Sequence, residues 1–305
     1  MHEKSKLRIY FDLTVPDYSI LLLLNIMIYG LLFRILLPEI LSLSALWVGL
    51  SLHHQASGAI NSLFEIDLDR VSKPDRPLPA KRVSEKTVLL LTILLYALSF
   101  SSLSLLSFIM NNLSFLVAGI VLFILWMLYC SPRIYLKRKL FAGSLVGAIY
   151  YGGVPFILVW TLTNQESFPI LLFVYIFALS FVIANTKDFE DYNAELELDY
   201  STLPIKLGYT LALKLIPISL IVINFVFLVI SLSGIMNFIL AISYIAGIIL
   251  GFGLFHLFRK ENLVALIDGQ RVVTQSKIVS AGMAYYTIVV FLLSVTVFMS
   301  GIATI

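Results

Sequence analysis

Long apolar runs alternate with short polar segments along this chain. A helix needs roughly 20 apolar residues to cross a hydrocarbon core about 30 Å thick, and nine runs are long enough. Most of them end at a helix breaker or a polar cluster, such as Leu37-Pro38-Glu39. The predicted spans are 16–37, 40–64, 87–106, 113–131, 141–163, 168–187, 209–232, 236–258 and 278–302.

The composition supports a membrane protein. Hydrophobic residues make up 60% of the 305 residues and charged residues make up 13%, against roughly 25% in soluble domains. Charge persists to Asp17 and no small-residue cleavage site follows the first apolar run, so we expect no cleaved signal peptide. The pattern predicts a single all-α integral membrane domain over residues 1–305.

Lysine and arginine residues fall almost entirely in the N-terminal tail and in every second connection between the predicted spans. Cytoplasmic loops of membrane proteins carry such an excess of positive charge. We therefore expect the N-terminus and the basic loops to lie on the cytoplasmic side of the cell membrane, and the C-terminus to lie on the external side. The net charge of +3 follows from this topology and is no sign of a nucleic-acid partner. No protein partner is predicted.

A polar stripe closes the second apolar run. Asn61, Glu65 and Asp69 recur every four residues, so on a helix they lie on one face. Carboxylate and amide oxygens suit a hard divalent cation such as Mg²⁺. His53 continues the stripe deeper into the run, and an ionisable residue inside a span is costly enough to be a functional candidate. The alternative for His53 is a hydrogen bond to a neighbouring helix.

A second acidic block closes the sixth apolar run. Asp188, Asp191 and Glu195 follow one another at spacings of three and four residues. Carboxylates this dense repel one another unless water or a metal ion screens them. We expect Glu190 and Glu197 to face water. The resulting hypothesis is that the two acidic blocks hold two or more metal ions around one diphosphate.

Basic residues accompany both blocks on the predicted cytoplasmic side. Arg76 lies on a loop stiffened by three prolines, where a guanidinium can bind phosphate oxygens through two parallel hydrogen bonds. Lys137 and Arg138 follow an aromatic and basic stretch before the fifth run, and Lys187 adjoins the second block. The alternative for Arg76 is a solvated side chain on a basic surface loop.

Other kinds of site are missing from the sequence. It contains no phosphate-binding glycine loop, no HExxH zinc motif and no GxSxG nucleophile motif. The single cysteine, Cys130, excludes an intrachain disulfide and is expected to fill space in the apolar core. Within the fifth run, Gly147, Gly152, Gly153 and Pro155 predict a close helix approach or a kink.

The two blocks together resemble the UbiA superfamily of intramembrane prenyltransferases. The family's first motif, NxxxDxxxD, matches Asn61, Glu65 and Asp69, with Glu in place of the middle Asp. Its second motif, DxxxD before a Thr-Leu-Pro segment, matches Asp191 and Glu195, again with one Glu for Asp. Two further matches are the segments KPDRPLP (73–79) and YCSPRIYLKRK (129–139).

The resemblance implies an all-α ring of nine transmembrane helices around a central cavity. Members transfer a prenyl group from an isoprenyl diphosphate to a lipophilic acceptor in the membrane, with Mg²⁺ as cofactor. Metal ions and cationic side chains neutralise the departing diphosphate, and an apolar chamber shields the allylic carbon from water. By position, the implied metal ligands are Asn61, Glu65, Asp69, Asp188, Asp191 and Glu195, and the implied diphosphate-binding residues are Arg76, Lys137, Arg138 and Lys187.

Departures from the family pattern leave the reaction open. Each Glu keeps the charge of the Asp it replaces but moves the oxygens by about 1 Å, enough to alter catalysis. Asp199 stands where many members have Gly. Cyclisation of the prenyl diphosphate without an acceptor is therefore an alternative, while His53 is a candidate residue on the acceptor side.

Transport of a cation or an anionic lipid is the alternative from another class. Its signature would be carboxylates near the middle of the membrane in two inverted repeats, and this sequence shows neither. The acceptor is not encoded in the motifs, because members use quinone precursors, chlorophyllide, haem or glycerol phosphates. The KPDRPLP segment resembles most the branch that contains archaeal-lipid and chlorophyll synthases.

The one-sided charge distribution predicts an odd number of spans. A topology reporter fused after Ile305 should therefore report the external side of the membrane. Cytoplasmic activity of the same fusion would mean an even number of spans and would contradict the nine-helix ring.

Overall fold

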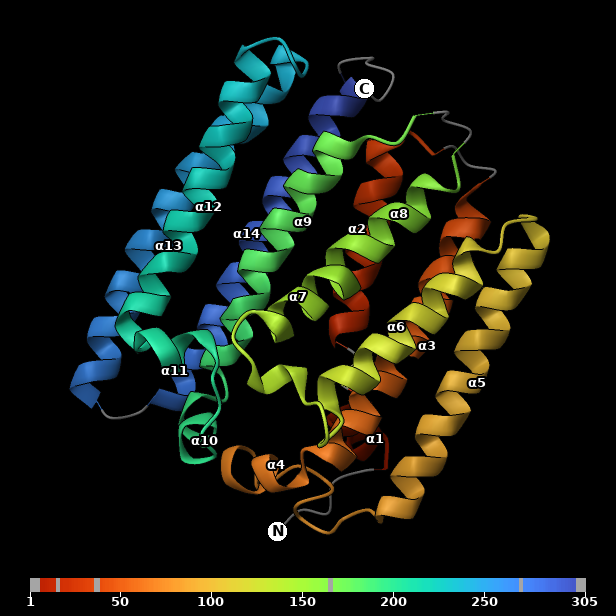
Figure 1. The fold of residues 1–305 in the computed structure, drawn as a ribbon, viewed down its shortest axis with the longest axis vertical. Helices are drawn as coiled ribbons and strands as arrows, with labels where there is room; N and C mark the ends of the chain where they lie inside the picture. The colour runs from red at the N-terminus through yellow and green to blue at the C-terminus, as the bar shows by residue number, and fades with distance from the viewer. Residues whose placement is uncertain (1–5, 15–16, 36–38, 164–166, 269–270, 300–305) are drawn as a thin grey trace. The chain divides into compact units, whose positions relative to one another are not determined.

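The computed structural model describes residues 6–14, 17–35, 39–163, 167–268 and 271–299. All secondary structure in these ranges is helical, which confirms the predicted all-α class (Figure 1). Contacts group the chain into two compact units, Met1–Met27 with Leu36–Lys137 and Ile28–Ile35 with Arg138–Ile305. The prediction of one domain over the whole chain stays a prediction, and Ile305 lies outside the described residues.

In the first unit, two long helices, α3 and α5, lie side by side (Figure 1). Gly49 allows their close approach, because a Cβ atom there would lie 2.8 Å from Leu103 Cδ2. Ser99 Oγ donates a hydrogen bond of 2.8 Å to the Gly49 carbonyl, which joins the two helices. The elements are α1 (Lys6–Thr14), the start of α2 (Asp17–Leu32), α3 (Ile40–Phe64), α4 (Ile66–Ser72), α5 (Glu85–Ile109), α6 (Ser114–Cys130) and the 3₁₀ turn η2 (Leu136–Arg138), which ends at the border.

The second unit contains the end of α2 and the rest of the chain. Of its longest helices, α13 packs against both α12 and α14. The elements are α7 (Ala142–Ala148), the π turn η3 (Ile149–Gly153), α8 (Val154–Trp160), α9 (Ile170–Ala184), η4 (Asn185–Phe189), α10 (Tyr192–Glu197), α11 (Leu203–Leu207), α12 (Tyr209–Leu232), η5 (Phe238–Leu240), α13 (Ala241–Asp268) and α14 (Arg271–Met299).

A π turn interrupts the fifth predicted span. It lies between α7 and α8 and includes Gly152 and Gly153, and Pro155 follows in the first turn of α8. A Cβ atom on Gly152 would lie 2.1 Å from Ser180 Oγ in α9, so only glycine fits this contact. The predicted irregularity and close approach in this run are confirmed.

A buried polar network joins four helices of the second unit. Asn224 in α12 accepts a hydrogen bond of 2.8 Å from the Tyr175 hydroxyl in α9 and donates one of 2.9 Å to the Tyr285 hydroxyl in α14. Tyr285 donates in turn to the Gly247 carbonyl in α13 at 3.0 Å. These polar groups are buried among apolar residues, which offer no hydrogen bonds. The network supplies the partners that they need.

Six described helical segments are long and apolar enough to cross a membrane, and shorter apolar helices cover Ser19–Leu32 and Ser114–Cys130. α3 matches the predicted second span but is not among these segments, since it carries polar residues such as His53, His54 and Gln55. The count of nine spans and the ring therefore stay predictions. The six segments are Glu85–Ile109, Ala142–Trp160, Ile170–Phe189, Tyr209–Leu232, Phe238–Arg259 and Lys277–Met299.

Replacing Gly247 with alanine should destabilise the second unit. The added Cβ would lie 2.1 Å from Asn224 Oδ1, and Asn224 is held in place by hydrogen bonds to two tyrosines. We expect overpacking to cost about 1–3 kcal/mol, measured as a lower thermal unfolding midpoint in detergent. The matched control is Gly253→Ala in the same helix, where nothing lies within 4 Å; an equal loss in both variants would contradict the argument.

Candidate functional site

The first acidic block lies at the junction of α3 and α4. α3 ends at Phe64, and Glu65 leaves helical geometry with φ −103° and ψ 17°. The four-residue hydrogen-bond spacing nevertheless continues: Glu65 N donates to Asn61 O at 2.9 Å, and Asp69 N donates to Glu65 O at 2.8 Å. The three residues therefore keep the backbone hydrogen bonds of a helical turn, although Glu65, the middle residue, interrupts the helix.

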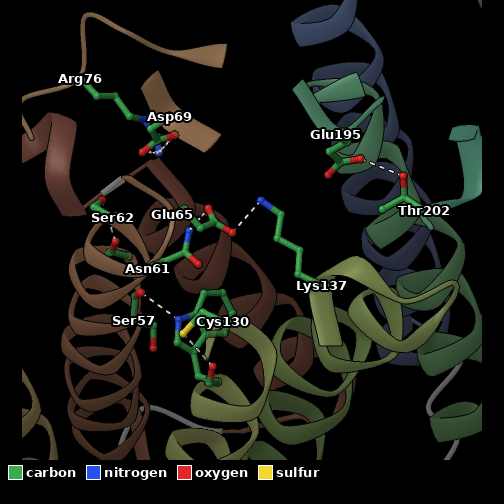
Figure 2. Close-up of polar contacts among 12 residues, drawn as sticks. Ser57, Asn61, Ser62, Glu65, Asp69, Arg76, Cys130, Lys137, Glu195 and Thr202 are labelled. Atoms are coloured by element: carbon green, nitrogen blue, oxygen red, sulfur yellow. Dashed lines mark hydrogen bonds and ion pairs between the residues drawn. The ribbon is translucent and has the colours of Figure 1, made fainter. Parts of the chain in front are cut away.

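Glu65 is almost fully buried and contacts two polar side chains. Its side chain is 3% exposed. Asn61 Nδ2 donates a hydrogen bond to Glu65 Oε2, and Lys137 Nζ forms an ion pair with Glu65 Oε1 at 2.8 Å (Figure 2). Lys137 is itself only 6% exposed, and it comes from the turn that follows α6. The structure thus brings together a predicted metal ligand and a predicted diphosphate-binding residue.

Asp69 is paired with Arg76 in the same unit. Arg76 Nη1 contacts both carboxylate oxygens, at 3.0 Å and 2.9 Å, so one nitrogen serves both oxygens (Figure 2). Burial raises the pKa of Asp69, and the positive charge of Arg76 acts in the opposite direction. The cation therefore favours the ionised carboxylate, which is the form that binds metal.

The proline-containing loop is fixed to the helices beneath it. Leu78 is 4% exposed and belongs to a core cluster with Leu13, Ala59 and Val88. Hydrogen bonds from Arg76 N to Lys73 O and from Ala80 N to Arg76 O, both 3.0 Å, close the loop into turns. The predicted stiff loop is confirmed by this packing and bonding.

The second acidic block follows the end of the sixth predicted span. α9 ends at Ala184, residues 185–189 form a 3₁₀ turn, and Asp191 precedes the short helix α10. Two side chains bond back to the preceding turn: Asn185 Nδ2 to Phe181 O and Thr186 Oγ1 to Ile183 O, both at 2.7 Å. Such bonds compete with helix continuation, so the block follows the end of α9 and does not lie within it.

Glu195 is completely buried, and Thr202 Oγ1 donates to its Oε2 at 2.8 Å (Figure 2). Asp191 is 4% exposed, whereas Lys187 and Asp188 are half-buried. The sequence offered Thr202 only as part of a motif and gave it no role. Its position seven residues after Glu195 was the available signal.

Arg138 belongs to the second unit and contacts the segment after α10. Its guanidinium lies over the Tyr200 ring, 4.7 Å from the centroid, and its carbonyl accepts a hydrogen bond of 2.8 Å from Ser201 N. Asp199 has φ 54°, in the left-handed region that glycine favours and that Asp tolerates. This backbone conformation agrees with a position where many members of the resembled family have Gly.

The oxygen atoms of the first block fit Mg²⁺. No group of three His, Cys, Asp or Glu side chains in the described part of the chain is arranged as a ready metal site. Mg²⁺ does not require one, because it is usually bound by one or two carboxylates together with water and substrate phosphates. Asn61 Oδ1 is buried and has no hydrogen-bond partner among the described residues. It can therefore act as an oxygen ligand beside Glu65 and Asp69.

His53 and Cys130 lie within the helices of the first unit. His53 is fully buried, its ring is 5.0 Å from the Tyr96 ring, and it hydrogen-bonds to the backbone of Gly119. Its role on the acceptor side stays a prediction. Cys130 is buried and donates to the Trp126 carbonyl at 3.0 Å, as expected of a space-filling residue. Glu197 is exposed as predicted.

The sequence model of the UbiA prenyltransferase family matches residues 23–267. The chain belongs to this family. UbiA family membership and the apolar helices together identify a multi-pass membrane protein.

Two curated relatives are digeranylgeranylglyceryl phosphate synthases. The protein of Methanothermobacter thermautotrophicus is 26% identical over 204 residues, which are 65% of this chain and 66% of that protein. The protein of Methanosphaera stadtmanae is 28% identical over 160 residues, which are 52% of this chain and 56% of that protein. This UbiA family chain thus matches between about half and two thirds of their lengths.

A solved structure of a UbiA homologue from Archaeoglobus fulgidus, bound to GPP and Mg²⁺, resembles this chain with a TM-score of 0.60. The two are 17% identical, and the match covers 92% of this chain and 99% of the other. At this identity the likeness shows that the two proteins share the UbiA fold.

Breaking the Glu65–Lys137 pair should strongly destabilise the protein. Lys137→Met leaves a buried carboxylate without its counter-ion, which costs about 3–5 kcal/mol. The double variant Glu65→Gln with Lys137→Met removes both charges and should recover most of the thermal unfolding midpoint, measured in detergent with a chelator.

The control pair is Asp67 and Arg70, which lie 2.7 Å apart with side chains 80% and 58% exposed. An exposed pair contributes at most about 1 kcal/mol, so Arg70→Met should change the midpoint little. A double variant that unfolds as early as Lys137→Met would show that the buried charge is not the cause.

Proposed function

We propose that this protein transfers a prenyl group from an isoprenyl diphosphate to a lipophilic acceptor within the membrane, with Mg²⁺ as cofactor. The observation that carries the proposal is a set of oxygen ligands, the buried carboxylates of Glu65 and Asp69 and the buried Oδ1 atom of Asn61, with Lys137 and Arg76 beside the two carboxylates. Family membership supports the reaction class, and the homologue bound to GPP and Mg²⁺ supports the substrate and the metal.

Asn61, Glu65 and Asp69 are the proposed metal ligands of the first unit. Bound Mg²⁺ would neutralise the negative charge that develops on the diphosphate as its bond to the allylic carbon breaks. Lys137 and Arg76 have a second role in this proposal, as donors to diphosphate oxygens. A guanidinium suits this role because it binds phosphate oxygens through charge-assisted hydrogen bonds.

The second block is proposed to supply further metal ligands. Asp191 and Glu195 are buried, and Thr202 Oγ1 donates a hydrogen bond to one Glu195 oxygen, which orients this carboxylate. Asp188 is proposed as an additional ligand, and Lys187 and Arg138 as further diphosphate donors. Carboxylate oxygens are the ligands that Mg²⁺ prefers, which supports this role.

The fold that we propose for this reaction is a ring of nine transmembrane helices around an apolar cavity. The basic loops and both acidic blocks would lie on the cytoplasmic side, with the C-terminus outside. An apolar chamber favours transfer because it keeps water away from the electron-poor allylic carbon.

A glycerol phosphate lipid is the proposed acceptor class. The names of the curated relatives support it, and the KPDRPLP segment of this chain agrees with that branch. Product analysis separates this reaction from cyclisation, because a cyclase would release a terpene and diphosphate without consuming any acceptor.

Neutralising a proposed ligand should abolish Mg²⁺-dependent turnover. Glu65→Gln and Glu195→Gln keep the side-chain size but remove the charge that binds metal, so we expect kcat/KM to fall by roughly 10²–10³. The assay is transfer of a radiolabelled prenyl group from purified protein to a lipid extract, with Mg²⁺ varied. The controls are Asp67→Asn and Glu197→Gln, exposed carboxylates next to each block. Wild-type rates in both buried variants would overturn the metal assignment.

A further inference from the structure

A second basic site lies in the first unit. A cavity of about 420 Å³ is bounded by α4, the end of the proline-containing loop and the start of α5. Arg70, Lys81 and Arg82 line it, with one carboxylate, Glu85. None of the proposed metal ligands or diphosphate-binding residues is part of its wall.

The cations of this cavity are poorly neutralised. Arg70 pairs with Asp67, but both side chains are mostly exposed, and such a pair is weak. Arg82 Nη1 reaches only a neutral acceptor, the Asp75 carbonyl, at 3.4 Å. No carboxylate forms an ion pair with Lys81 or Arg82 within the described residues. The cavity therefore keeps a positive potential that suits an anion.

The backbone of Lys81 has a conformation that lysine rarely adopts. Its φ is 56°, in the left-handed region, where glycine is favoured. Hydrogen bonds from Lys81 N to Leu78 O at 3.0 Å and from Arg82 N to Pro77 O at 2.8 Å close the turn around it. The turn therefore places a cationic side chain at a backbone position where glycine would be less strained.

The cavity also has an apolar side, and the helix that bounds it has an exposed apolar surface. Ile66, Leu78 and Val83 complete its wall. α5 begins at Glu85 behind the cap Ser84, whose Oγ accepts a hydrogen bond from Thr87 N. One to two turns later its exposed surface becomes apolar, with Leu90 58% and Ile93 57% exposed. α5 is among the helices long enough to cross a membrane.

We propose that this cavity binds the phosphate-bearing headgroup of an anionic membrane lipid, whose acyl chains lie along the exposed face of α5. A cationic pocket at the end of a membrane helix matches a lipid phosphate, and the apolar helix surface matches its chains. A free phosphate ion would use the charges but not the apolar surface. The proposal does not depend on prenyl transfer, so the two can fail separately.

The test is native mass spectrometry of the full-length protein in a neutral detergent, titrated with dioleoyl phosphatidylglycerol or dioleoyl phosphatidylcholine. We expect phosphatidylglycerol to bind at least roughly tenfold more tightly. Lys81→Gln with Arg82→Gln should weaken its binding by roughly ten- to thirtyfold, as expected for the loss of two basic residues at a membrane surface. Equal binding of the two lipids would overturn the proposal.

The matched control is Lys86→Gln with Arg133→Gln, which removes the same charge from two exposed positions outside the cavity. It should change phosphatidylglycerol affinity by less than about threefold, and a loss equal to that of the cavity variant would mean general surface attraction. Inorganic phosphate at millimolar concentration should not displace the lipid. Displacement would assign the cavity to a free phosphate and overturn the lipid proposal.

Lys81→Gly separates binding from folding. Glycine relieves the left-handed strain, so the thermal unfolding midpoint should stay the same or rise while phosphatidylglycerol affinity falls at least roughly threefold. A lower midpoint with unchanged affinity would show that Lys81 serves the fold and would overturn its role in the cavity.

Discussion

A carboxylate enclosed by apolar residues is stable only when a cation or hydrogen-bond donors lie beside it, and the first unit meets this constraint at two successive positions. Glu65 is held by Asn61 and Lys137, and Asp69 by Arg76. Arg76 comes from the loop that follows α4, whereas Lys137 comes from a turn that is distant in the sequence from α3. The two ion pairs therefore fix the proline-containing loop and the turn after α6 around the junction of α3 and α4. The site and the loop conformations depend on the same charges.

Much of the helical framework could be predicted because membrane helices obey a simple physical rule. An apolar run long enough to cross a bilayer must satisfy its backbone internally, and a helix does so. α3 and α12 accordingly cover the predicted ranges 40–64 and 209–232. The four-residue spacing of Asn61, Glu65 and Asp69 also survived in the structure, because local backbone hydrogen bonds define it.

The rest of the site depends on contacts that a linear pattern does not contain. The 3₁₀ turn after α9 is accompanied by side-chain bonds from Asn185 and Thr186, and the pairing of Lys137 with Glu65 joins residues 72 positions apart. The left-handed backbone at Lys81 is imposed by a turn, whereas its residue type alone favours the right-handed region. The spacing of the acidic residues along the sequence identified the carboxylates of the site, but it could not identify the residues that pair with them.

The network around Asn224 has a consequence for how the second unit can move. Tyr175, Asn224, Tyr285 and the Gly247 carbonyl come from α9, α12, α14 and α13. Rotation of any one of these helices about its own axis would strip a buried polar group of its partner, and lipid offers no replacement. These four helices can therefore shift only together, as one rigid block. Adjustments to different substrates would have to come from the segments outside this block, and the four positions would have to change in concert during evolution.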